Sequence, residues 1–181
     1  MATKKISAMT NGVTANAGDL IPIVRSGANK YITPDYLHPR AQLDNDVSPF
    51  NNITITTAVT TALTFDNIAF DTGGFYSAGQ PTRFTVPVTA LYLIHCHIQW
   101  SGSSGSGIRR LKITRNGAAE IGFADDGLTT HTNQVFQSLT IMRYLTAADY
   151  VRMEVLQTSG GNLDILQNDM SPVFAIARLG F

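Results

Sequence analysis

The fold is decided by one stretch of ten residues, Leu91-Tyr92-Leu93-Ile94-His95-Cys96-His97-Ile98-Gln99-Trp100. Every second residue from Tyr92 to Trp100 has an apolar body, which is the period of a β-strand with one face in a core. The other face mixes apolar and polar side chains: Leu91, Leu93, His95, His97 and Gln99. The alternation therefore predicts a long strand with one core face and a second face suited to an interface.

The composition around this stretch is that of an all-β protein. The chain has 181 residues, and only 14% of them are charged, against roughly one quarter in an average domain. Its 13 basic and 13 acidic residues cancel, so neither nucleic acid nor an anionic membrane is an expected partner. The single Cys excludes a framework of intrachain disulfides. We expect no export signal and no membrane insertion, because no apolar run is long enough.

Short β-rich runs follow one another from about residue 44, and no helical period extends over eleven residues. Besides the strand at 91–100, we expect strands at 53–56, 62–65, 83–87, 108–115, 133–145, 149–157 and 173–179. Asn116-Gly117 is the strongest hairpin signal, Asp126-Gly127 is an ordinary turn signal, and the Gly/Ser-rich segment 101–107 is predicted to be a flexible loop. The fold class is therefore all-β, either a sandwich or a jelly roll.

Residues 65–181 resemble the C1q-like globular head of the C1q/TNF jelly-roll superfamily. The resemblance rests on five segments in the family's order: Phe70–Tyr76, Arg83–Tyr92, Leu111–Gly117, Ala147–Val155 and Ser171–Ile176. Ala90 and Ala175 stand where the family usually has Gly. The resemblance implies a C1q/TNF-like jelly-roll sandwich that forms a homotrimer, with the strand at 91–100 nearest the threefold axis. The trimer-axis candidates are Leu91, Leu93, His95 and His97.

The first part of the chain has a different character, so we divide it into an N-terminal segment, 1–43, and a jelly-roll head, 44–181. A small hairpin is expected over 20–33 and a short helical turn over 33–37. Segments 5–10, 18–24 and 30–37 resemble the N-terminal segment of bacteriophage fibre and receptor-binding proteins, which implies an extended arm that anchors the chain to other virion proteins. The anchor candidates are Ile6, Leu20, Ile21, Pro22, Ile23, Tyr31 and Leu37.

His95 and His97 are the sharpest chemical feature of the sequence. Two imidazoles at this spacing leave the same face of a strand and can chelate a metal ion, and three copies around an axis would supply six. The alternative is that they are ordinary interface or surface histidines. A calcium ion could use Asp125-Asp126, Asp164 and Asn168-Asp169, although these fit equally well as loop carboxylates in water. Cys96 faces away from both histidines, so they cannot activate its thiol.

The two resemblances together predict a bacteriophage virion protein, made in the host cytoplasm and located on the particle. We expect a trimeric tail or head fibre, or a receptor-binding knob, that binds a host-surface glycan or protein through many weak contacts. The loop candidates for this binding are Phe123, His131, Asn133 and Asn162. No catalytic motif is recognisable, so an enzyme is not expected, and no cofactor beyond a possible ion is implied. Two alternatives stay open: a capsid decoration protein, and a virion-borne glycan-processing enzyme.

Overall fold

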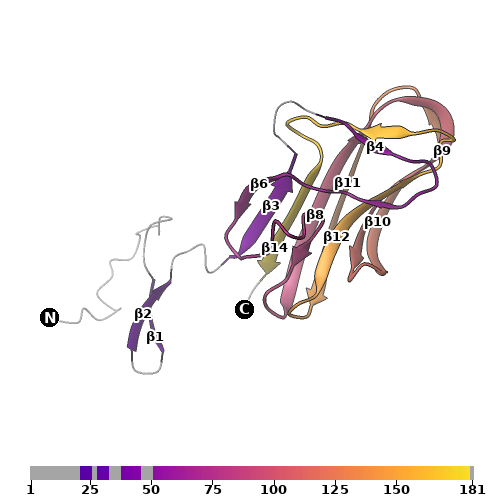
Figure 1. Ribbon diagram of the computed structural model, residues 1–181. Helices are drawn as coiled ribbons and strands as arrows, with labels where there is room; N and C mark the ends of the chain where they lie inside the picture. Colours follow the sequence, from indigo (N-terminus) through magenta and orange to yellow (C-terminus); the bar gives the residue numbers. More distant parts are fainter. Residues whose placement is uncertain (1–20, 26–27, 33–37, 46–50, 180–181) are drawn as a thin grey trace, which may run out of the picture. The chain divides into compact units, whose positions relative to one another are not determined.

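The computed structural model describes residues 21–25, 28–32, 38–45 and 51–179 (Figure 1). The chain divides into two compact units, residues 1–37 and residues 38–181. Within the described residues there are fourteen strands and no helix, so the all-β prediction is confirmed.

In the first unit the described residues form a hairpin, as the sequence predicted. Strand β1 (Ile21–Arg25) pairs antiparallel with β2 (Ala28–Ile32), and Ile23 lies opposite Lys30. Three of the anchor candidates, Ile21, Pro22 and Ile23, belong to β1, and Tyr31 belongs to β2. The candidates Ile6, Leu20 and Leu37, and the helical turn expected over 33–37, lie outside the described residues.

The second unit is a sandwich of two antiparallel sheets (Figure 1). One sheet, here called the β8 sheet, is built around the strand predicted at 91–100. Its order is β4-β13-β8-β14-β3-β6, and β11 pairs with β8 as well. The bounds are β3 (Arg40–Asp44), β4 (Ile53–Ile55), β6 (Asn67–Asp71), β8 (Ala90–Trp100), β11 (Val135–Leu145), β13 (Leu163–Ile165) and β14 (Val173–Leu179).

The facing sheet, here called the β9 sheet, has the order β10-β9-β12-β5, and β7 pairs with β12. Its strands are β5 (Thr61–Ala62), β7 (Phe84–Thr85), β9 (Ser103–Arg115), β10 (Ala119–His131) and β12 (Tyr150–Gln157). The hairpin predicted at Asn116-Gly117 joins β9 to β10, and both residues have positive φ (54° and 73°), as a type I′ turn requires.

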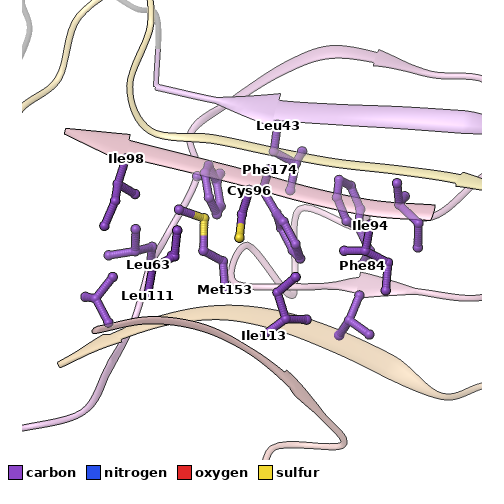
Figure 2. Close-up of a cluster of buried hydrophobic side chains, with 14 of the residues drawn as sticks. Leu43, Leu63, Phe84, Ile94, Cys96, Ile98, Leu111, Ile113, Met153 and Phe174 are labelled. Atoms are coloured by element: carbon purple, nitrogen blue, oxygen red, sulfur yellow. The ribbon is translucent and has the colours of Figure 1, made fainter. Parts of the chain in front are cut away.

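The core lies between the two sheets and follows the alternation of β8. Tyr92, Ile94, Cys96, Ile98 and Trp100 are all fully buried. Figure 2 shows Ile94, Cys96 and Ile98 pointing from β8 toward side chains of the facing layer, such as Leu111, Ile113 and Met153. Aromatic rings extend the core: the ring of Phe174 is stacked on that of Phe65, with a centroid distance of 5.9 Å, and packs at a tilt on that of Phe84, at 4.7 Å. The predicted core face of β8 is therefore confirmed.

The sandwich takes in residues that precede the boundary drawn at residue 44. Strand β3 begins at Arg40 and pairs with both β14 and β6, so that Leu43 lies opposite Phe174 and Ile68. Ala41 and Leu43 are buried in the core. A version of the head that starts at residue 44 would lose this strand, whereas one that starts at residue 38 keeps it.

Two local predictions were wrong, and both concern the hairpin of β9 and β10. The segment 101–107 is not a flexible loop, because β9 already begins at Ser103. Its glycines allow the backbone of β9 to lie close to neighbouring backbone. A Cβ on Gly107 would lie 2.4 Å from the carbonyl oxygen of Thr158. Asp126-Gly127 is not a turn but part of β10, where register shifts next to Asp126 interrupt the ladder.

Candidate interface and binding cavity

The outer face of the β8 sheet carries an exposed apolar patch, which the alternation of three strands creates. Leu93 lies opposite Met142 of β11 and Ala177 of β14, and Leu91 lies opposite Tyr144 and Leu179. Met142 is 58% exposed and Tyr144 is 66% exposed. We call these six residues the apolar patch: Leu91, Leu93, Met142, Tyr144, Ala177 and Leu179. Large apolar side chains gathered on a free surface mark an interaction site.

His95 and His97 continue the same face beyond the patch, as the sequence predicted. The Nδ1 atom of His95 lies 2.8 Å from the Oγ1 atom of Thr140. The ring of His97 lies 5.7 Å from the ring of Phe136, centroid to centroid. Partial burial, and secondarily the neighbouring His95, lower the pKa of His97. The four trimer-axis candidates therefore share one face, and their position at an axis stays a prediction.

The outer face of the β9 sheet has the opposite character. Arg110 and Asp125 form a two-pronged ion pair with both N–O distances at 2.6 Å. Lys112 lies 3.5 Å from Glu154, and the guanidinium of Arg110 lies 4.9 Å from the ring centre of Phe123. On the described outward positions of β8, β11 and β14 there is no Lys, Arg, Asp or Glu. One face of the sandwich therefore suits water, and the other suits a protein surface.

The metal-ion predictions find limited geometric support. Across the described residues, no three His, Cys, Asp or Glu side chains gather closely enough to hold a metal ion. One copy offers two imidazoles on one face, so a metal site there needs ligands from another copy. The loop carboxylates proposed for calcium are not brought together: Asp125 is on β10 and pairs with Arg110, whereas Asp164 is on β13 and accepts a hydrogen bond from Thr54.

Cys96 is buried, and burial raises the pKa of its thiol to about 12. Its Sγ donates a weak hydrogen bond to the carbonyl oxygen of Leu139 at 3.7 Å. The two flanking histidines lie on the opposite face of β8, as predicted. The thiol is therefore a packing group and not a nucleophile.

The four receptor-loop candidates lie in different parts of the head, and one of them, Asn133, lines a cavity. Asn133 lines a cavity of about 630 Å³ together with Gly102, Thr132, Gln134 and Phe136. Phe123 is on the charged face of β10, and Asn162 follows the turn at 160–161 between β12 and β13. His131 ends β10, opposite Ser103 in the ladder.

Sequence reasoning did not find Phe136 and Gln134, the other large side chains of this cavity. Phe136 is 51% exposed at the start of β11. The signal was available, because Phe136 shares its period with the outward residues Ser138 and Thr140, and an outward Phe beside a loop is unusual. Gln134 gives no such signal, since an amide before a strand is ordinary.

The sequence matches no protein-family model and no curated protein. Solved structures do match. Murine APRIL, crystallised at pH 5.0, superposes with a TM-score of 0.57 at 10% identity, over 78% of this chain and 99% of that one. Eiger TNF from S. frugiperda gives 0.57 at 13% identity, over 80% and 94%. The globular domain of the zebrafish complement 1qA protein gives 0.50 at 17% identity, over 79% and 95%.

These similarities show the fold. The second unit is a TNF- and C1q-like jelly roll, as the five segments of the sequence resemblance implied. A search of the described residues for a helix that is long and apolar enough to cross a membrane finds none.

Proposed function

We propose that this chain is a bacteriophage virion protein whose jelly-roll head forms a homotrimer and attaches the particle to the host surface. The observation that carries the trimer is the apolar patch, which lies on β8, β11 and β14, whose described outward positions hold no Lys, Arg, Asp or Glu. The charged residues Arg40 and Asp44 lie beside it, on the neighbouring strand β3. The attachment role rests on the sequence resemblance of the first forty residues to phage fibre segments. The role requires binding alone and no chemical step.

A second copy of the same chain is the occupant that best fits the patch. The patch and its continuation at His95 and His97 have the apolar centre and polar margin of protein interfaces. The charged outer face of the β9 sheet does not complement it, because burying unpaired ions against apolar side chains is costly. Copies therefore meet through their β8 sheets, which leaves the partly exposed ion pair of Arg110 and Asp125 in contact with water. A TNF- or C1q-like fold is compatible with three copies arranged in this way.

The mass in solution tests the trimer. Light scattering of the full chain and of a version starting at His38 is expected to give three times the chain mass for both. Met142→Asp places a carboxylate in the patch and should raise the dissociation constant by roughly 30-fold or more, because burying an unpaired charge costs about 2 kcal/mol or more. Met170→Asp is the matched control, since Met170 is 59% exposed and lies outside the patch. A monomeric head, or equal effects of both substitutions, contradicts the proposal.

Experiments with virions distinguish an attachment function from capsid decoration. Particles whose chain lacks residues 38–181 should fail to adsorb to host cells, while retaining their stability to heat and dilution. Particles that adsorb normally but fall apart would instead identify a decoration protein.

A further inference from the structure

The cavity beside Asn133 lies at the end of the sandwich where β8 stops and β11 starts. In the ladder Trp100 lies opposite Val135 and Gln99 lies opposite Phe136. Leu91, in the apolar patch, is eight residues from Gln99 along β8, which corresponds to roughly 25 Å. The apolar patch and the cavity therefore lie toward opposite ends of one sheet face, and His97 lies between them, with its ring 5.7 Å from that of Phe136.

Two loops that touch each other form one wall of the cavity. A Cβ on Gly102 would lie 2.3 Å from the carbonyl oxygen of Thr132, so only glycine allows the backbone after β8 to approach the backbone before β11 this closely. The other wall is the exposed ring of Phe136. The cavity is wide and open, with a volume of about 630 Å³, so a bound molecule would keep one side in water.

A buried amide network fixes the polar part of the wall. Gln99 is only 5% exposed, and its Nε2 donates to the Oε1 of Gln134 at 2.5 Å. The Oε1 of Gln99 in turn accepts from the Nδ2 of Asn168 at 2.7 Å, and its backbone N–H donates to Ser171 Oγ at 2.8 Å. Gln134 is therefore held by a core residue, with its amide NH₂ group as remaining donor capacity.

The chemistry of the lining selects the class of ligand. None of the five described lining residues is charged, so these five offer nothing to neutralise a phosphate or a carboxylate and no set of anionic ligands for a cation. It offers amide and hydroxyl groups, which both donate and accept hydrogen bonds, beside one exposed aromatic ring. A neutral molecule with many hydroxyl groups and an apolar C–H face matches both features.

We propose that this cavity is a carbohydrate-binding site, in which Asn133, Gln134 and Thr132 hydrogen-bond sugar hydroxyls and the ring of Phe136 packs against the C–H face of one pyranose. The inference rests on the proposed attachment function in one respect, since it names the class of receptor that such a head would bind. In a trimer the three cavities would bind one surface together, which raises the overall affinity through avidity.

The test uses the full chain, an array of oligosaccharides released from bacterial surface polysaccharides, and saturation-transfer NMR with the strongest binder. Asn133→Ala and Phe136→Ala are expected to weaken binding at least tenfold. Each has a matched control: Asn162→Ala for the exposed loop amide, and Phe123→Ala for the ring, since Phe123 is 53% exposed. The controls should stay within twofold of the parent chain. Light scattering of Phe136→Ala checks that the trimer persists, and Asn133→Ala tests the cavity away from the sheet face.

Two results overturn the inference. One is the absence of binding to every saccharide of the array at millimolar concentration. The other is binding that both cavity substitutions leave unchanged. Host cells separate this failure from that of the attachment function: a labelled full chain that binds cells after periodate oxidation of their carbohydrate refutes the carbohydrate site and keeps attachment. If the chain binds no host cell, the attachment function is refuted. The carbohydrate site is then judged only by whether the cavity variants lose binding to the array.

Discussion

Ala148 has a left-handed backbone conformation, with φ at 71°, in the turn between β11 and β12. Its N–H donates to the carbonyl oxygen of Val86 at 2.9 Å, and the N–H of Asp149 donates to Thr146 at 2.9 Å. An L-residue with a Cβ is strained in this region by about 1–2 kcal/mol. We predict that Ala148→Gly raises the free energy of unfolding by about 1 kcal/mol, measured by urea denaturation, because part of the gain is offset by the greater freedom of Gly in the unfolded chain.

Ala147 is the matched control, because it precedes Ala148 in the same turn and is not among the residues with positive φ. Ala147→Gly should lower stability by a few tenths of a kcal/mol to about 1 kcal/mol. Equal signs for the two substitutions would show that the backbone strain at Ala148 does not control the turn.

Arg109 is a fully buried cation on the core face of β9, in line with Leu111 and Ile113. Within the described part of the chain, none of its three guanidinium nitrogens has a hydrogen-bond partner. Burial lowers the pKa of this guanidinium, and Asp126 across the hairpin acts in the opposite direction. Replacing a poorly compensated buried ion by an apolar side chain of similar length often stabilises by about 1–4 kcal/mol.

We therefore predict that Arg109→Met raises the midpoint of thermal unfolding, whereas Arg109→Ala lowers it because it leaves a cavity. Calorimetry of the two variants beside the parent chain measures both effects. A large loss of stability in Arg109→Met would mean that the guanidinium is needed where it lies.

At the scale of elements, the first residues of β9 are a place where glycine is required by contact. A Cβ on Gly107 would lie 2.4 Å from Thr158 O and 2.7 Å from Ser159 N, and backbone atoms cannot move aside as a flexible side chain can. Overpacking of this kind costs about 1–3 kcal/mol. Gly107→Ala should therefore destabilise the head by about 2 kcal/mol in urea denaturation.

Gly127 provides the comparison, because it is on the paired strand β10 and a Cβ there would meet nothing within 4 Å. Gly127→Ala should be neutral or slightly stabilising. If both variants behave alike, the approach of β9 to residues 158–159 is looser than these distances indicate.

Three strands of the head, β8, β10 and β3, show where sequence reasoning succeeds and fails. β8 was predictable with both faces, because an unbroken period of two over ten residues states which side is buried. β10 was not, because register shifts near Gly122, Asp126 and His131 break that period, and Asp126-Gly127 has the composition of a turn. β3 was missed since five residues with only Ala41 and Leu43 turned inward give too short a pattern.

For the cavity, the limit is one of distance along the chain. Asn133 was a candidate because loop amides bind polar ligands, but Gly102, on the facing wall, is 31 residues away in the sequence and is brought near by the pairing of β8 with β11. The buried Gln99 that holds Gln134 is an amide inside an otherwise ordinary strand. The local sequence shows the chemistry of such residues. It does not show their neighbours in space, because these depend on the pairing of strands far apart in the sequence.

On the scale of the whole molecule, the lowered pKa of His97 makes the stability of the fold depend on pH. Partial burial and the neighbouring His95 lower this pKa below its ordinary value near 6.5, so the folded chain binds fewer protons than the unfolded chain, and stability falls as the pH drops through that value. The groups that face His97 are His95 on its own strand, Ser138 and Phe136 of β11, and Val173 of β14. None of these is an acid that would stabilise an imidazolium.

Covering His97 with a second copy would add to its burial, so the proposed trimer should favour the neutral imidazole further. We predict that lowering the pH from 7.5 to 5.5 raises the dissociation constant of the trimer at least tenfold, measured by light scattering over micromolar dilutions. His97→Asn should weaken this dependence by removing one titrating group, while His38→Asn, which changes an exposed histidine outside the β8 face, should leave it intact. An unchanged pH dependence in His97→Asn would mean that His97 stays hydrated in the assembly and that copies meet through some other part of the surface.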